Sequence, residues 1–137
     1  MTLLETEIVH LTVGLTLALT IFYLSKSRSL ALFSFLVNLL MDVDHLFDYF
    51  LYFGLKFNLN DFLKGAAFDQ SGQVYTLFHA WEWPVLLTLL GLKFQRKILW
   101  TLALTIFLHV LTDVLTNRMY FSDYSFIFRY LHDFRIR

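Results

Sequence analysis

The segment ILWTLALTIFLHVLTDVLTN occupies residues 98–117 and places two ionisable side chains inside an otherwise apolar run. Its length matches the roughly 20 residues that a helix needs to cross a hydrocarbon core about 30 Å thick. It lacks the strict alternation of a transmembrane β-strand. His109 and Asp113 are four residues apart, so on a helix both side chains point the same way. The segment therefore predicts a membrane-spanning helix with a polar pair on one face.

Three more apolar stretches have similar lengths and similar charged or turn-forming boundaries. The predicted spans are about 8–24, 30–53, 74–92 and 98–117. The link of residues 54–73 carries an amphipathic segment, and the tail of residues 119–137 mixes Tyr, Phe and Arg, as interfacial segments do. The sequence thus predicts a single all-α domain over residues 1–137. We expect an integral membrane four-helix bundle with an interfacial segment between its second and third helices and an interfacial C-terminal tail.

Composition supports a membrane protein and excludes several classes of function. Hydrophobic residues make up 58% of the 137 residues and charged residues 16%, against roughly 45–50% and 25% in soluble domains. The mean hydropathy is +0.60. Eleven basic residues balance eleven acidic ones, which excludes a basic nucleic-acid binder. The chain has no Cys, so disulfides, thiolate metal sites and cysteine nucleophiles are excluded as well.

Charge in the short loops predicts the orientation of the spans. An even number of spans puts both termini on one side of the membrane and the loops of residues 25–29 and 93–97 on the other. Those loops hold five basic residues and no acid: Lys26, Arg28, Lys93, Arg96 and Lys97. The positive-inside bias makes such loops cytoplasmic. We therefore expect the half of the membrane nearer the termini to be extracytoplasmic, although arginines in the tail oppose this orientation.

Ionisable residues occur in all four predicted spans, where each costs several kcal/mol unless it is paired, hydrated or bound to an ion. They are His10, Asp42, Asp44, His45, Asp48, His79, Glu82, His109 and Asp113. At about 1.5 Å per residue, all of them lie roughly 15–27 Å from the loop ends of their helices. Helices that run up and helices that run down therefore place these side chains in one layer, in the half of the membrane nearer the termini.

Imidazoles and carboxylates that project inward from facing helices are typical of metal sites in helix bundles. The predicted metal ligands are His10, Asp42, Asp44, His45, His79, His109 and Asp113. Nitrogen and oxygen donors suit Zn, Mn, Fe or Mg, with Zn favoured, and a set this rich in carboxylates suits two ions. Glu82 and Asp48 are the predicted catalytic residues, as the general base. Direct ligation, or a carboxylate that orients a His, remains open for both.

The order of these elements resembles the YdjM-type family of membrane-bound metal-dependent hydrolases. The matching elements are His10 with Gly14, Asp42-Val43-Asp44-His45, His79, and His109 with Asp113. The chain departs from the family pattern at Met41, where the family has Pro, and at Glu82, which replaces a second central His. The resemblance implies hydrolysis. Because the family signature is similar to that of zinc-dependent phospholipase C, it also implies a phosphoester of a lipid as substrate.

The combined expectation is a metal-dependent hydrolase in which metal-activated water attacks a phosphoester or ester of a membrane lipid. The alternatives are a divalent-metal transporter or sensor, a di-iron membrane oxidase, and a structural membrane subunit. The spans hold five acids and no Lys or Arg, a sum of −5 if all are ionised. Two divalent cations would cancel most of that charge, and protonation of some carboxylates would also reduce it.

Overall fold

The computed structural model describes residues 3–117 and 119–135, and their regular structure is helical. The elements are α1 (Leu3–Ser25), α2 (Arg28–Leu40), the 3-10 turn η1 (Met41–Asp44), α3 (His45–Phe53), α4 (Leu59–Leu63), α5 (Ala66–Ser71), α6 (Glu82–Phe94), α7 (Lys97–Thr116), the 3-10 turn η2 (Phe121–Tyr124) and α8 (Phe126–Leu131). Within those ranges the structure has no β-strand, and one isolated bridge pairs Gln73 with Arg135. The predicted all-α class is confirmed.

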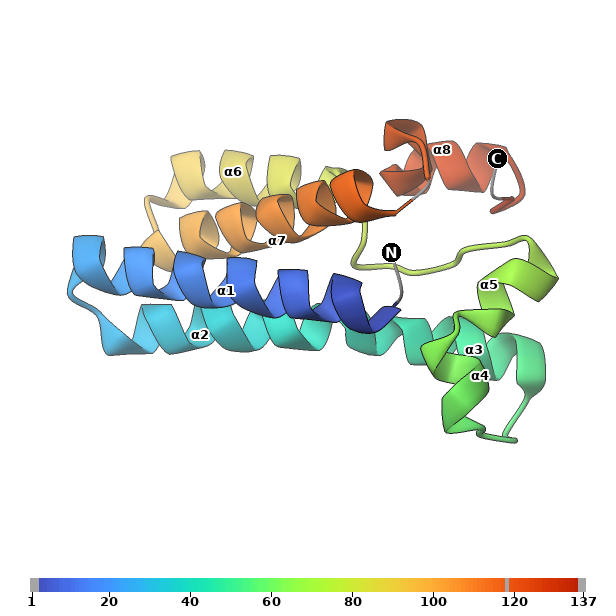
Figure 1. Cartoon of the computed structure of the whole chain (residues 1–137). Helices are drawn as coiled ribbons and strands as arrows, with labels where there is room; N and C mark the ends of the chain where they lie inside the picture. Colours follow the sequence, from blue (N-terminus) through green and yellow to red (C-terminus); the bar gives the residue numbers. More distant parts are fainter. Residues whose placement is uncertain (1–2, 118, 136–137) are drawn as a thin grey trace.

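The long helices lie side by side and the short ones gather at one end (Figure 1). Helices α1, α2 and α7 pack against one another, and α6 packs against α7. Helices α3, α4, α5 and α8 lie at the end where both termini are found (Figure 1). The bundle therefore has a loop end, at the α1–α2 and α6–α7 connections, and a terminal end.

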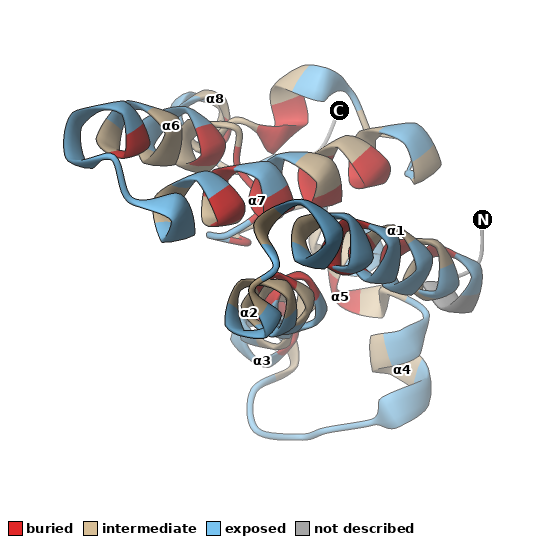
Figure 2. Ribbon diagram, turned by 90° about the vertical axis from the view of Figure 1, so that its left-hand side faces the viewer, coloured by how far each residue is buried: buried red, intermediate tan, exposed pale blue. Residues whose placement is uncertain are grey.

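Three helical segments are long and apolar enough to cross a membrane: Glu5–Ser25, Arg28–Phe53 and Lys97–Thr116. Their outward faces are exposed and their inward faces are buried (Figure 2). On the exposed face of α1, the hydroxyls of Thr12, Thr16 and Thr20 donate to the carbonyl four residues earlier, at 2.7–2.8 Å. A hydroxyl satisfied in this way can face lipid without an unpaired donor.

Polar side chains join the helices inside the bundle. Ser34 of α2 and Thr105 of α7 are fully buried, and their hydroxyl oxygens lie 2.8 Å apart. Nearer the terminal end, Asn38 Nδ2 donates to the His10 carbonyl at 3.0 Å. Gly14 of α1 permits this approach, because a Cβ there would lie 2.3 Å from Asn38 Nδ2. Close packing and interhelical hydrogen bonds of this kind hold membrane helices together.

The second predicted span, residues 30–53, forms as α2, η1 and α3 in direct succession. The 3-10 turn falls on Met41–Asp44. A 3-10 turn winds the chain more tightly than an α-helix does and brings side chains three residues apart into line. The 3-10 turn therefore changes the directions of the Asp42, Asp44 and His45 side chains from those they would have on a continuous α-helix.

The third predicted span, residues 74–92, is wrong in its first part. Residues 72–81 form a non-helical segment, and α6 starts at Glu82 and ends at Phe94. At 13 residues α6 is about 20 Å long, shorter than the hydrocarbon core. Two side chains from η1 and α3 bind the backbone N–H groups that a helix would use: Asp48 binds those of Tyr75 and Thr76, and Asp44 that of Phe78.

The link and the tail both pack on the protein. Helix α5 in the link contacts α3. The carbonyl of Phe134, in the tail, accepts the Val74 N–H at 2.9 Å, and the Phe134 ring stacks on that of Tyr75 with centroids 4.7 Å apart. Arg129 of α8 is only 2% exposed. The tail thus covers the non-helical segment of residues 72–81, a role that its composition alone did not indicate.

Candidate metal centre

Seven side chains meet at the terminal end of the bundle and are called the His/Asp cluster below. They are His10, Asp42, Asp44, His45, His79, His109 and Asp113. They come from α1, η1, the first residue of α3, the non-helical segment of residues 72–81, and α7. These are the seven residues that the sequence predicted as metal ligands. Helix α1 starts at the terminal end of the bundle, whereas α2 and α7 start at the loop end. Their cluster residues meet because they lie at the same depth along the bundle.

Asp42 lies at the middle of the cluster. Its Oδ1 is 3.2 Å from His79 Nε2, 3.4 Å from His45 Nε2 and 3.4 Å from His109 Nε2. Its other oxygen, Oδ2, is 3.7 Å from His10 Nδ1. The single carboxylate therefore faces all four imidazoles, and its two oxygens point to different ones.

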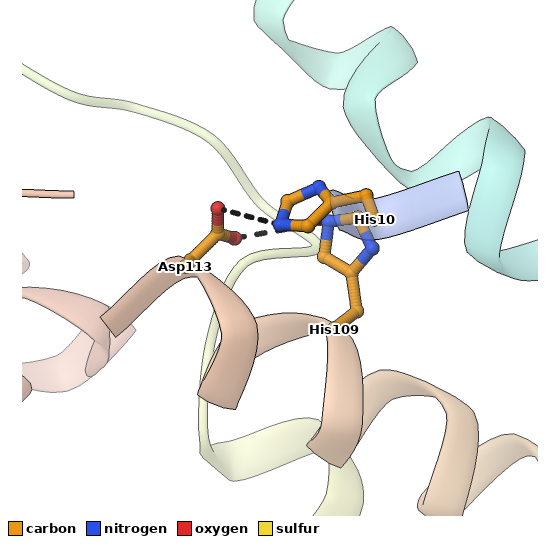
Figure 3. Close-up of side chains that lie close together, drawn as sticks. All are labelled: His10, His109 and Asp113. Carbon is orange, nitrogen blue, oxygen red and sulfur yellow. Dashed lines mark ion pairs between the residues drawn. The ribbon is translucent and has the colours of Figure 1, made fainter. Parts of the chain in front are cut away.

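One part of the cluster joins α1 to α7. His10 Nε2 lies 3.3 Å from Asp113 Oδ1, and the rings of His10 and His109 have centroids 4.2 Å apart (Figure 3). His109 and Asp113 occupy successive turns of α7, and His109 Nε2 is 3.7 Å from Asp113 Oδ2. The predicted four-residue spacing thus brings this pair to the same point.

The other part of the cluster joins η1 and α3 to the non-helical segment. His79 Nδ1 lies 3.1 Å from Asp44 Oδ1. The rings of His45 and His79 have centroids 4.6 Å apart. Because Asp44 also accepts the Phe78 N–H at 2.8 Å, it fixes the backbone beside His79 as well as the ring.

The cluster is buried and short of hydrogen bonds. His109 is fully buried and His10, His79 and Asp113 are nearly so, whereas the side chains of Asp42 and His45 are 18% and 25% exposed. Several buried cluster atoms find no hydrogen-bond partner among the described residues: His10 Nδ1 and Nε2, Asp44 Oδ1, His45 Nδ1 and Asp113 Oδ2. Most buried polar groups in proteins are paired. The His10, Asp44 and Asp113 atoms of this set lie within 3.1–3.7 Å of other imidazole or carboxylate atoms without the geometry of a hydrogen bond. A donor set of this kind fits a divalent metal ion.

The ligand-type atoms fall into groups compact enough to hold an ion. In each group, one atom per residue lies within 4.8 Å of the others. Two of these groups share no residue: His10, His109 and Asp113 form one, and Asp44, His45 and His79 form the other. Asp42 lies between them and has contacts to both. The buried His/Asp cluster could therefore hold a metal ion.

Arg129 holds the segment that carries His79. Its guanidinium donates to Thr76 Oγ1 at 2.9 Å, to the His79 carbonyl at 3.1 Å and to the Val74 carbonyl at 3.4 Å. Burial lowers the pKa of Arg129, and nearby carboxylates, Asp48 first among them, oppose that shift. An arginine 50 residues away in the sequence has no local pattern that would assign it to this site.

The two predicted catalytic carboxylates bind backbone instead. Asp48 Oδ1 and Oδ2 accept the N–H groups of Tyr75 and Thr76 at 2.9 and 3.1 Å. Glu82 accepts the Ser125 hydroxyl at 2.5 Å and N–H groups at the start of α8. Partial burial opposes the charged form of Glu82, but these hydrogen bonds outweigh it and hold its pKa below the usual value. Neither carboxylate belongs to the compact groups of the cluster.

Glu7 is a carboxylate at the cluster that the sequence analysis missed. A carboxylate oxygen of Glu7 lies within 4.8 Å of a ring nitrogen of His10 and of a carboxylate oxygen of Asp42. The Glu7 side chain is partly exposed. The signal that could have found it is the three-residue spacing from His10, which puts both on one face of α1. Glu7 lies just before the predicted span of residues 8–24, so it was not counted among the ionisable residues of the spans.

A cavity of about 560 Å³ opens beside the cluster. Cluster residues His10, Asp42, His45, His79 and Asp113 line it. Glu7 and Arg129 also line it, whereas Asp48 and Glu82 do not. The volume falls within the range of about 300–1,000 Å³ that is usual for small-molecule sites. The cluster is therefore a buried centre with access to a ligand-sized space.

Similarity to known proteins gives no further assignment of this site. The YdjM-type resemblance rests on the motif residues alone. No protein-family model, no curated protein and no solved structure matches the chain.

Proposed function

We propose that the chain is a membrane-embedded, metal-dependent hydrolase whose catalytic centre is the His/Asp cluster. The observation that carries the proposal is the convergence of four imidazoles on the Asp42 carboxylate, in a buried site beside a ligand-sized cavity. Buried carboxylates and imidazoles at membrane depth persist when they have a compensating partner. Divalent ions would be that partner.

The arrangement supports two ions better than one. His10, His109 and Asp113 would hold the first, and Asp44, His45 and His79 the second. Asp42 would lie between the two sites, since its carboxylate faces His10 and His109 of the first and His45 and His79 of the second. A pair of divalent ions supplies a nucleophile at neutral pH and neutralises charge on a phosphoryl group. Zn suits these ligands best, and Mn, Fe or Mg would also accept them.

Glu7 is the residue placed to accept the proton of the attacking water. It lines the cavity beside His10 and Asp42, and it is partly exposed. The carboxylates of Asp48 and Glu82 are bound to backbone N–H groups and lie off the cavity. The proposal therefore assigns the general base to Glu7 in place of the Glu82 and Asp48 of the sequence-based prediction.

The interior on the loop side of the cluster supports hydrolysis over metal transport. Among the described residues buried there are the small hydroxyl side chains of Ser34, Thr101 and Thr105. Ser34 and Thr105 bond to each other, and Thr105 also donates to the Thr101 carbonyl at 2.8 Å. A transport path needs polar ligands that continue across the bilayer, whereas the hydroxyls of Ser34 and Thr105 are already paired. In this proposal the loop end is cytoplasmic, in agreement with the basic residues of its two loops.

The proposal is tested by hydrolysis assays on purified protein in lipid nanodiscs, loaded with Zn²⁺ or Mn²⁺. The substrates are bis(p-nitrophenyl) phosphate and a phospholipid panel. We expect chelation to abolish turnover and Glu7→Gln to lower kcat by about 10²–10⁴-fold with metal content unchanged. Glu5→Gln, an exposed carboxylate of the same helix, is the matched control. Bound metal without hydrolysis of any substrate, together with metal flux into proteoliposomes, would establish the transporter instead.

A further inference from the structure

The cavity beside the His/Asp cluster has a polar end and an apolar end. Its polar end is the cluster itself with Glu7. Its other walls come from α3, α4 and α5, through Leu46, Tyr49, Phe62, Leu63, Ala67 and Phe68. A site for a small polar substrate does not require an apolar wall of this kind. The division points to a ligand that is itself part polar and part apolar.

The apolar wall begins directly at the cluster. The Phe68 ring meets the His45 ring edge-on, with centroids 5.2 Å apart. Farther along, the rings of Tyr49 and Phe62 lie edge to face at 5.7 Å. A molecule whose reacting group lay at the cluster would therefore have its next atoms against Phe68 and those beyond against α3 and α4.

The rim of the apolar end is open to the surroundings. Leu63 of α4 and Val43 of η1 both line the cavity and are both 50% exposed. Val43 lies within the candidate membrane-spanning segment Arg28–Phe53. An apolar rim beside the membrane lets a chain enter the cavity without crossing water.

We propose that the apolar end is a chain-binding subsite, which receives an alkyl or acyl chain of a phosphate-bearing amphiphile. The inference rests on the proposed function, and it adds the substrate class and the residues that select it. Chain and phosphate would bind together: the phosphate at the His/Asp cluster, and the chain between α3 and the α4–α5 pair. Because apolar area is removed from water as the chain grows, binding strengthens with chain length until the cavity is full.

The test is calorimetric titration of metal-loaded protein in nanodiscs with inorganic phosphate and with butyl, hexyl and octyl phosphate. Empty nanodiscs correct for partition into lipid. The association constant, calculated from the free aqueous concentration of each ligand, should rise by up to about fourfold per methylene, which corresponds to about 0.8 kcal/mol. Ala67→Phe fills the cavity from α5, where Ala67 is only 4% exposed. Its matched control is Ala66→Phe, next to it on α5 and outside the cavity lining.

The subsite is supported if the dependence on chain length is present in wild type and Ala66→Phe and lost in Ala67→Phe, with inorganic phosphate binding unchanged. Should Ala67→Phe fail to fold, Leu63→Trp replaces it, with Leu59→Trp as control, because both leucines are half exposed on α4 and Leu63 alone lines the cavity. Equal affinity for all chain lengths in wild type, or an unchanged dependence in the filling variants, overturns the subsite. Metal content, measured on the same samples, shows whether the metal centre itself has failed.

Discussion

His79 and His109 face each other through their Nε2 atoms, which lie 3.1 Å apart, and Asp42 Oδ1 is 3.2 and 3.4 Å from the same two nitrogens. Two facing imidazole nitrogens cannot both carry a hydrogen along the line that joins them, so at least one presents a lone pair. The carboxylate oxygen beside them presents lone pairs as well. Such a convergence is stabilised by a proton or by a metal cation, and the other donors of the cluster favour the metal.

Gly14→Ala is expected to damage the cluster without altering any ligand. The new Cβ would lie 2.3 Å from Asn38 Nδ2, the group that donates to the His10 carbonyl. Displacement of Asn38 shifts α1 relative to α2 and moves His10 away from Asp113. Metal affinity, measured by competition with a chromogenic chelator, should fall along with the unfolding temperature. Gly91→Ala is the control, because its new Cβ would lie 3.1 Å from the Trp100 ring, at the loop end and far from the cluster. It should lower the unfolding temperature and leave the metal affinity unchanged.

Arg129→Met is expected to release the segment that positions His79. It removes donors to buried acceptors, each of which costs about 1–3 kcal/mol when left unpaired. In Co²⁺-loaded protein, the visible absorption should shift toward a spectrum with fewer nitrogen ligands. Arg96→Met, an exposed arginine at the loop end, is the control. An unchanged Co²⁺ spectrum in a folded Arg129→Met protein would show that Arg129 only supports the fold.

Glu82→Gln is expected to lower stability by about 1 kcal/mol at neutral pH, because the carboxylate caps the start of α8. The pKa of Glu82 is held below its ordinary value of 4.5. Its contribution is therefore complete above that value and is lost as the pH falls through the lower pKa of the folded state. The difference in unfolding temperature between wild type and variant should be constant near neutral pH and should shrink in acid. A variant of wild-type stability with no hydrolytic activity would instead restore Glu82 as a catalytic residue.

Asp48→Asn is expected to destabilise the protein and leave the metal content at saturating metal unchanged. An amide has one carbonyl oxygen, whereas Asp48 uses two oxygens to accept the N–H groups of Tyr75 and Thr76. One buried N–H then lacks an acceptor, at about 1–3 kcal/mol. Thermal unfolding with metal analysis on the same samples measures both quantities. Loss of bound metal from a folded Asp48→Asn protein would make Asp48 a ligand.

The helical class was predicted correctly, and three of the four predicted spans are helices long and apolar enough to cross a membrane. The seven residues predicted as metal ligands also meet in the cluster. Each of these features depends on local length or depth. The sequence could not predict that residues 74–81, the first part of the third predicted span, are non-helical. This part is as apolar as a span, and the acceptors that replace its helical hydrogen bonds belong to Asp44 and Asp48, distant in sequence. As a result, His79 and Glu82, which both fall in the predicted span of residues 74–92, do not lie on one helix. His79 points into the cluster and Glu82 caps α8.

The structure also differs from the sequence-based expectation in the charge close to the cluster. The predicted spans contain acids and no basic residue, yet Arg129 of the tail reaches the non-helical segment next to the cluster. The hydrogen bonds of Arg129 go to a segment about 50 residues away, and no local sequence pattern predicts such contacts. The composition of the tail therefore predicted that this arginine lies at the membrane interface. One guanidinium offsets only part of the negative charge of Asp42, Asp44 and Asp113. Protons on the cluster, or the metal ions of the proposed function, would offset the rest.

The measurement that tests the metal centre most directly is elemental analysis of protein purified in nanodiscs and equilibrated with Zn²⁺. Wild type should retain two ions per chain. His109→Ala and Asp113→Asn should lose at least one of them, and His132→Ala, a histidine outside the cluster, should retain both. Wild-type protein that is folded and holds no stoichiometric metal, or cluster variants that hold as much metal as wild type, would contradict the account.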